Sequence, residues 1–186
     1  MPLRPSAPWL LLPLLLAACD ALPPPGGGPS LTLMDAAPGA LLPPGQVARA
    51  CDVRGAALGT PIEAAAGYVV HDTAPGSTAP RTHYVTGFSD GCPRQVTAAL
   101  AVLGDPLTHE TYRYESLTGP YGEVDRAYEA VKASVCGVGA GEPCGAATDR
   151  LSADTAFLST YPVFGGPDFA DVLFHAGEVV AADPVQ

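Results

Sequence analysis

The chain has 186 residues and carries nine Lys and Arg against 19 Asp and Glu, so its formal net charge is −10. Nucleic-acid binding needs clustered basic residues, and with scattered arginines and the single lysine Lys132 we expect no nucleic-acid partner. Hydrophobic residues make up 47%, so most of the chain is expected to fold, and its length suits one domain. Gly and Pro, with 21 residues each, are about twice as frequent as usual and predict a low-complexity stretch.

The first 18 residues have the pattern of a signal peptide. Arg4 supplies the positive start, and an apolar run follows from Ala7 to Ala18. A membrane-spanning helix needs about 20 apolar residues, whereas the apolar part of a signal peptide has about 7–15. The run is therefore too short to span a bilayer and predicts a segment that is removed after export.

The leader ends in Leu16-Ala17-Ala18-Cys19, which resembles the lipobox of bacterial lipoproteins. The resemblance covers the leader alone. It implies cleavage before Cys19, lipidation of this cysteine, and attachment of the chain to a lipid bilayer with its domain facing the periplasm. Lipidation of this type adds at least two acyl chains, enough for lasting attachment. The alternative is an ordinary secretory signal with a chance cysteine at its end.

A tether is expected after the lipidated cysteine. Asp20 resembles the residue that retains such lipoproteins in the inner membrane; the alternatives are an outer-membrane location or the mere start of a polar linker. From Asp20 to Gly45, 12 of 26 residues are Pro or Gly, which disfavour helix and sheet. We predict a disordered tether over 19–46, in which 31–34 could pack locally, and a single globular envelope domain over 47–186.

Four further cysteines lie in the predicted domain, namely Cys51, Cys92, Cys136 and Cys144. In the oxidising compartment that export implies, an even number of cysteines indicates disulfides. Three pairings are open. We favour Cys51 with Cys92 and Cys136 with Cys144, because the second pair flanks a Gly-rich loop. A metal site is the rival interpretation, but the sequence lacks the CxxC spacing that structural zinc sites use.

Helical periodicity is clearest over residues 123–136. Apolar residues recur there at spacings of three and four, acidic residues occupy the first turn, and Gly137 can cap the end. A second helix is predicted over 93–103, since Pro93 suits a first turn and alanines follow. The same stretch also alternates like a strand, so the helix is favoured over the strand only narrowly.

Strand-like segments occupy much of the remaining domain. They are rich in β-branched and aromatic residues, or alternate between apolar and polar ones, over 67–71, 82–88, 108–115, 155–161, 171–175 and 178–181. This order predicts an α+β domain, a small antiparallel sheet with one or two packed helices, stapled by two disulfides.

Most known catalytic patterns fail in this sequence. His109-Glu110 begins like a zinc-protease helix, but Arg113 stands where the second histidine is required. The GxSxG pattern of serine hydrolases does not occur, and the chain contains no Asn. We therefore expect no cofactor and assign no catalytic residue.

A group of polar residues in the middle of the sequence is the candidate binding site: Arg81, His83, Asp90, Arg94, His109 and Glu110, with Arg113 nearby. Asp90 and Arg94 are four residues apart and could pair at the start of a helix. On a strand, His109 and Glu110 would point to opposite faces. We expect these residues to form structural ion pairs around Cys92. The alternatives are a ligand or protein contact and catalysis by a histidine–carboxylate pair.

Taken together, these features predict a membrane-anchored envelope lipoprotein that acts as a non-enzymatic binding or structural module. Its acidic charge suits a basic or cationic envelope partner. The alternatives are an envelope hydrolase or transferase using His83 or His109, and a metal-ion binder using His71, His83 and His109. A histidine that shares a concave pocket with a carboxylate would favour the hydrolase or transferase.

Overall fold

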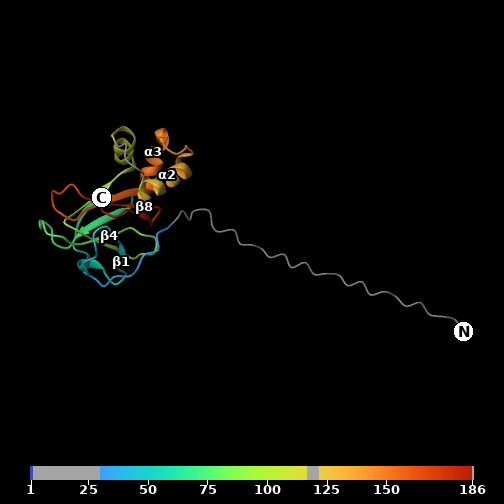
Figure 1. Cartoon of the computed structure of the whole chain (residues 1–186). Helices are drawn as coiled ribbons and strands as arrows, with labels where there is room; N and C mark the ends of the chain where they lie inside the picture. The colour runs from blue at the N-terminus through green and yellow to red at the C-terminus, as the bar shows by residue number, and fades with distance from the viewer. Residues whose placement is uncertain (2–29, 117–121, 186) are drawn as a thin grey trace.

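Two antiparallel sheets and three α-helices form the part of the chain that the computed structural model describes, namely residues 30–116 and 122–185 together with Met1 (Figure 1). The strands are β1 Ala48–Arg49, β2 Thr60–Ala65, β3 Tyr68–Asp72, β4 Arg81–Thr86, β5 Arg94–Ala98, β6 Leu100–Gly104, β7 Thr155–Tyr161, β8 Ala170–His175 and β9 Glu178–Ala182. The helices are α1 Pro106–Glu110, α2 Glu123–Cys136 and α3 Thr148–Asp154, with 3-10 turns at Gly55–Leu58 and Gly145–Ala147 and a π-helical turn, η2, at Thr111–Ser116.

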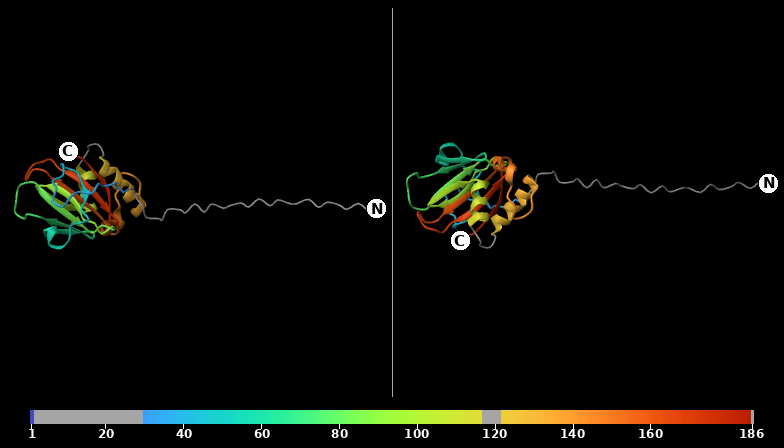
Figure 2. Two further views of the ribbon diagram at one scale, coloured as in Figure 1. Left: turned by 90° about the horizontal axis from the view of Figure 1, so that it is seen from below. Right: turned by 90° about the horizontal axis from the view of Figure 1, so that it is seen from above.

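The fold has three layers, which the views in Figure 2 show from two sides. One sheet has the order β1-β5-β4-β3-β2 and the other β6-β7-β8-β9. Their inner faces meet in an apolar core that includes Tyr68, Val70, Val85, Val96, Leu158, Val172 and Phe174. The outer face of the four-stranded sheet is covered by α2 and α3 through a second core that includes Val124, Tyr128, Leu151, Phe157 and Leu173. The α+β class is confirmed, with two sheets where one was expected.

The predicted helix over 93–103 is wrong, because this segment forms β5 and β6. Val96 of β5 and Ala101 and Leu103 of β6 all face the core between the sheets. Residues on one face of a strand are separated by an even number of positions, whereas Val96 and Ala101 are five residues apart. The chain leaves one sheet and enters the other between them. The Ala99 amide already donates to the Tyr161 carbonyl of the second sheet, at 2.8 Å. Burial of these alternating residues in the core between the sheets outweighs the helix propensity of the alanines.

The strand predicted over 108–115 is also wrong. Asp105 accepts hydrogen bonds from the backbone and the hydroxyl of Thr108, at 2.9 and 3.1 Å, and Pro106 occupies the first helical position. This start signal begins α1, which continues into η2. Polar residues that would alternate on a strand therefore project around a helical turn.

The helix over 123–136 is confirmed with the bounds expected. Gly137 ends α2 with a left-handed conformation, φ 73°, and its amide donates to the Ala133 carbonyl. At the start, Asp125 accepts from the Gly122 amide at 3.0 Å. Strands are also confirmed within the segments predicted over 67–71, 82–88, 155–161, 171–175 and 178–181.

The packed chain begins earlier than residue 47. Leu31 donates to the Val179 carbonyl at 2.8 Å, and the Gly39 amide donates to the Tyr84 hydroxyl at 2.8 Å. The Leu42 amide donates to the Thr97 hydroxyl at 2.7 Å. These contacts replace the disorder predicted for the second half of the tether, because its amides donate to a backbone carbonyl of β9 and to side chains on the outer face of the five-stranded sheet. Residues 20–29 lie outside the described part of the chain.

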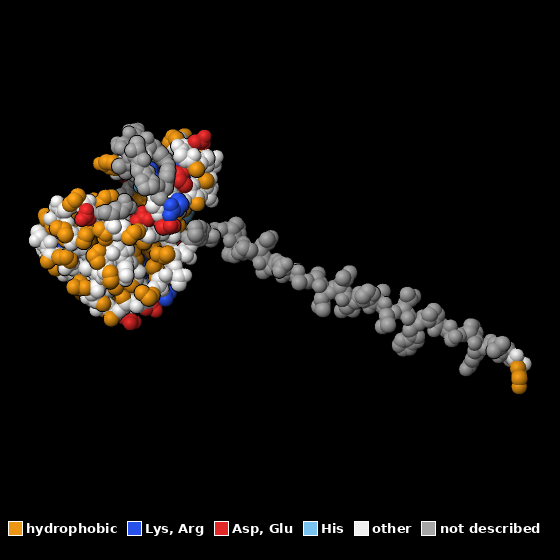
Figure 3. All heavy atoms as spheres, in the orientation of Figure 1, with side chains coloured by type: hydrophobic (Ala, Val, Ile, Leu, Met, Phe, Trp, Pro, Cys, Tyr) orange, Lys and Arg blue, Asp and Glu red, His pale blue; other side chains and the backbone are white. Residues whose placement is uncertain are grey.

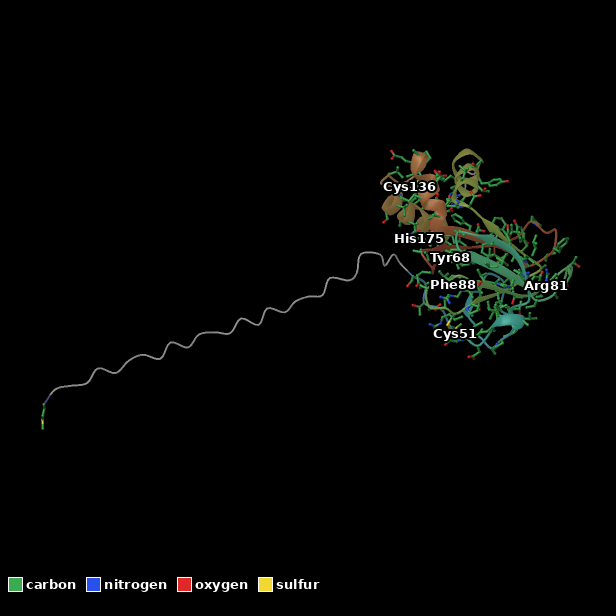
Figure 4. All side chains as sticks on the ribbon, turned by 180° about the vertical axis from the view of Figure 1, so that it is seen from behind. Cys51, Tyr68, Arg81, Phe88, Cys136 and His175 are labelled. Atoms are coloured by element: carbon green, nitrogen blue, oxygen red, sulfur yellow. A yellow bond between two sulfur atoms is a disulfide. The ribbon has the colours of Figure 1, made fainter. Side chains whose placement is uncertain are left out.

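Both predicted disulfides are confirmed. Cys51 and Cys92 are joined with a Cα–Cα distance of 4.4 Å, and Cys136 and Cys144 with one of 5.5 Å. Figure 4 shows that Cys136 lies in the helical layer and that Cys51 lies on the opposite side of the domain. The two disulfides therefore staple different layers.

Candidate functional site

A cavity of about 500 Å³ opens on the outer face of the four-stranded sheet. The walls of this cavity include residues of α1, η2 and the first turn of α2. Its volume is within the range of small-molecule sites. Figure 3 shows acidic and basic side chains gathered where the helical layer meets the sheets. The lining residues are Val102, Leu103, Gly104, Asp105, Thr108, His109, Tyr112, Arg113, Val124, Asp125, Phe157, Ser159, Tyr161, Phe169, Asp171 and Asp183.

The floor of the cavity is a row of residues across three strands. Val102, Ser159 and Asp171 are register partners on β6, β7 and β8, so the pleat places all three side chains on the outer face. The Ser159 hydroxyl donates to the Asp171 carboxylate at 2.6 Å. Burial raises the pKa of Asp171, and the negative charges of Asp183 and Asp125 act in the same direction.

The His109 imidazole forms part of the helical wall. It stacks on the Phe157 ring with a centroid distance of 4.1 Å and meets the Tyr128 ring edge-on at 4.8 Å. Its Nε2 lies 3.3 Å from Oδ1 of Asp125. The stacking fixes the imidazole plane and leaves the ring beside a carboxylate in a concave site.

Asp125 lies where the α1–η2 segment meets the start of α2. Its Oδ2 lies 3.0 Å from Nη2 of Arg113 and accepts from the Gly122 amide. Burial by itself raises the pKa of this carboxyl, but contacts with His109, the Gly122 amide and the Arg113 guanidinium outweigh burial and hold the pKa below its usual range. Asp125 therefore carries its negative charge at neutral pH and ties η2 to the start of α2.

Asp183, which lies near the C-terminal end of the sequence, caps the start of α2. Its Oδ1 accepts from the amides of Glu123 and Val124, at 2.7 and 3.2 Å. A carboxylate at a helix N-terminus satisfies amides that lack partners within the helix. Gly122 allows this approach, because a Cβ there would lie 2.4 Å from Oδ2 of Asp183. The cavity wall is thus built by residues 60 positions apart.

The cavity has aromatic walls and more acidic than basic side chains. Four of its lining residues are aspartates, against the single guanidinium of Arg113. The rings of Tyr112, Phe157, Tyr161 and Phe169 supply apolar surface. Such a site suits a ligand that carries positive charge on an apolar body.

The residues of the predicted polar group do not form one site. Val85 of β4 pairs with Arg94 of β5 while Arg81 pairs with Ala98, so the two arginines lie at opposite ends of these strands. Among the predicted binding residues, His109 lines the cavity, and Arg81, His83, Asp90, Arg94 and Glu110 do not. The expectation of a single cluster around Cys92 is therefore wrong, because strand pairing separates residues that are close in sequence.

Arg81 and His83 belong to a buried ionic group on the inner face of the five-stranded sheet. Arg81 binds both carboxylate oxygens of Asp72, at 2.7 and 2.5 Å, and also donates to the Ala99 carbonyl at 2.7 Å. The His83 side chain is 0% exposed, with Nε2 3.7 Å from Oδ2 of Asp72. Burial lowers the pKa of His83. A ring without access to solvent does not suit the catalytic role considered for His83.

Asp90 and Arg94 form the structural pair expected beside Cys92. Nη1 of Arg94 lies 3.0 Å from Asp90 and donates to the Cys92 carbonyl at 2.6 Å. The buried guanidinium also lies 4.2 Å from the centroid of the Phe88 ring. The pairing was predicted at the start of a helix, but it spans a turn and the first residue of β5.

Glu110 has a structural role behind the cavity wall. This buried side chain accepts from the Tyr128 hydroxyl at 2.8 Å and from the Cys144 amide at 3.3 Å. It thus joins α1 to α2 and to the loop that the second disulfide closes. The side chains of His109 and Glu110 point in different directions, as expected. They are neighbours on the helix α1, however, and not on a strand.

Metal ligation by the histidines is not supported by their positions. Across residues 30–116 and 122–185, no group of three or more His, Cys, Asp or Glu side chains is arranged to hold a metal ion. His71 lies 3.4 Å from the Thr86 hydroxyl on the five-stranded sheet, while His109 is on the helical side of the other sheet. These two histidines therefore lie in different parts of the fold.

Sequence reasoning missed most of the cavity, including Asp171. The strand predicted over 171–175 is confirmed, and it places Asp171 on the same face as the apolar Leu173. An acidic residue on an apolar strand face is the signal that pointed to it. Asp183 carried no comparable signal, because its role depends on a helix 60 residues away.

Comparisons with protein-family models, with curated proteins and with solved structures find no match to this chain. None of the helices in the described residues has the length and hydropathy to cross a membrane.

Proposed function

We propose that this protein is a membrane-anchored envelope lipoprotein whose domain is a non-enzymatic module that binds a small ligand in the cavity described above. The anchor is the lipidated Cys19 of the lipobox-like leader, and the domain faces the periplasm. Asp20 favours the inner membrane over the outer one.

The cavity is the observation that carries this proposal. Its helical wall is fixed by contacts that span the fold, namely the stacking of His109 on Phe157 and the capping of α2 by Asp183. A ligand site that is already formed loses little conformational entropy on binding. Aromatic walls around a few polar groups are typical of small-molecule sites.

The anchor is tested by changing Cys19 to Ser in the full chain. The variant keeps the signal peptide and is expected to appear in the soluble envelope fraction, because it has no acyl chains to hold it. The wild-type chain is expected in the membrane fraction. Recovery of the variant in the membrane pellet would contradict lipid anchoring.

Ligand binding is tested with the neutral probe 2-phenylethanol, observed by saturation-transfer NMR on the full Cys19→Ser chain. Val102→Trp fills the cavity from an exposed position on its floor and is expected to abolish the signal. Ile62→Trp is the matched control, because Ile62 is similarly exposed on β2 and does not line the cavity. Equal signals from both variants, or none from the parent chain, would refute the proposed site.

A second candidate function is hydrolysis, because His109 shares the cavity with carboxylates. An imidazole 3.3 Å from Asp125 has the arrangement of a general base held by a carboxylate. Activity on a panel of chromogenic esters and glycosides, lost in His109→Gln and kept in His71→Gln, would support hydrolysis over simple binding. Absence of turnover on the whole panel would favour the binding module.

A further inference from the structure

Asp171 differs from the other carboxyl groups of the cavity in its partners. Asp125 faces Arg113 and His109, Asp183 holds the amides of α2, and Asp105 caps α1. Among the described residues, the carboxylate of Asp171 accepts one hydrogen bond, from the neutral hydroxyl of Ser159. Within the described part of the chain, no lysine or arginine forms an ion pair with it.

An ionised carboxylate that is largely buried with one neutral partner is costly. The protein could lower this cost with a basic side chain, as it does for Asp72 with Arg81. At Asp171 it leaves the carboxyl facing a cavity instead. A bound cation would supply the missing charge, whereas an anion would meet four aspartates against one guanidinium.

Aromatic rings lie next to Asp171. Phe169 precedes it by two residues, and the Phe169 and Tyr161 rings are 5.6 Å apart between centroids. Both rings line the cavity, as does Phe157 on the other side of Ser159 along β7. A cation at Asp171 would therefore lie close to aromatic faces, which attract positive charge, and an apolar body attached to it would contact the rings.

We infer that the cavity takes a small primary amine on an apolar body, with its ammonium group on the Asp171 carboxylate and the body against Tyr161, Phe169 and Phe157. This inference rests on the proposed ligand-binding function and names its ligand class. It agrees with the cationic partner that the acidic sequence predicts. Arg113 does not oppose it, because its guanidinium is held 3.0 Å from Asp125.

The test compares 2-phenylethylamine with 2-phenylethanol, which share an apolar body and differ in the charged group. Affinities are measured by titration NMR on the full Cys19→Ser chain at neutral pH. The amine is expected to bind about tenfold more tightly than the alcohol or better, since charged hydrogen bonds are among the strongest. Equal or weaker binding of the amine would overturn the inference.

Asp171→Asn is the decisive variant, because the amide keeps the shape of the carboxyl and can still accept from Ser159. It is expected to weaken amine binding about tenfold or more and so to remove the preference for the amine over the alcohol. Asp52→Asn is the matched control, since it removes the same charge from an exposed site beside the first disulfide. An equal effect of both variants would mean that only the net charge matters and would contradict the inference.

The outcomes separate this inference from the function on which it rests. Binding of the alcohol without preference for the amine would refute the amine class and leave the cavity as a binding site. Absence of binding by either probe would refute both. If Asp171→Asn does not fold, amine-induced shifts of the Ser159 and Asp171 signals in the parent chain decide the matter, and shifts confined to other residues overturn the inference.

Discussion

Arg81 and Asp72 form a two-point ion pair on the inner face of the five-stranded sheet. The guanidinium Nε and Nη2 lie 2.7 and 2.5 Å from the two carboxylate oxygens. The same guanidinium binds the Ala99 carbonyl, where the chain crosses from one sheet to the other. The Asp72 side chain also accepts from the Ala74 amide at 2.8 Å, which closes the turn after β3. The pair thus secures a turn and the crossover together.

Removing Asp72 is expected to destabilise the fold strongly. Asp72→Ala leaves the Arg81 guanidinium, whose side chain is 12% exposed, without its carboxylate, and such losses cost about 3–5 kcal/mol. Asp35→Ala is the matched control, because it breaks an ion pair with Arg49 that is largely exposed and contributes about 0–1 kcal/mol. Urea unfolding of the disulfide-intact chain measures both. Similar losses in the two variants would contradict the buried role of Asp72.

Arg94 is expected to stabilise the turn that carries Cys92. Arg94→Ala removes the buried guanidinium from Asp90, the Cys92 carbonyl and the Phe88 ring, so the free energy of unfolding should fall by up to about 3 kcal/mol. Asp90→Ala should also lower the urea midpoint, since it leaves the Arg94 charge buried. Unchanged midpoints for both variants would show that the pair is not structural.

Stability is expected to fall in mild acid because of His83. Burial is the main reason that the pKa of His83 lies below its ordinary value of about 6.5. The unfolded chain therefore binds the proton more readily, and the free energy of unfolding decreases as the pH falls below about 6.5. The neighbouring Asp72 and Arg81 keep their charges in this range, since the pKa of Asp72 is lowered and that of Arg81 is raised.

The experiment is urea unfolding at several pH values between about 7 and 5, for the wild-type chain and His83→Gln. One proton contributes at most about 1.4 kcal/mol per pH unit. The variant is expected to lose part of the slope, and His175, whose pKa burial also lowers, should account for some of the remainder. The same slope in both proteins would show that His83 does not cause the acid sensitivity.

Breaking the second disulfide is expected to free one specific thiol. In Cys136→Ser, labelling of the denatured, unreduced protein followed by peptide mass spectrometry should modify Cys144 and leave Cys51 and Cys92 unlabelled. The loss of a cross-link that closes so short a loop should cost about 2.5 kcal/mol by the chain-entropy relation. Labelling of Cys51 or Cys92 in the variant would contradict the pairing.

Local signals account for the parts of the fold that the sequence predicted well. The helix over 123–136 carries its own apolar face and its Gly137 cap. Cys136 and Cys144 flank a short Gly-rich loop. Segments such as 155–161 show β-branched and aromatic residues at strand spacing. Each of these features depends on residues that are close in the sequence, so one sequence is enough to recognise it.

The functional residues were decided by the tertiary structure, because they come from segments that are distant in the chain. The sequence determined by itself that the chain is acidic, carries a lipobox-like leader and contains four cysteines suited to two disulfides. Strand pairing separated Arg81 from Arg94 and chose Asp72 as the partner of Arg81. Packing of the α1 region and α2 over the outer face of the sheet brought His109, Asp171 and Asp183 to one cavity. These contacts form only when burial of two apolar cores drives the layers together, and no pattern within one segment encodes them.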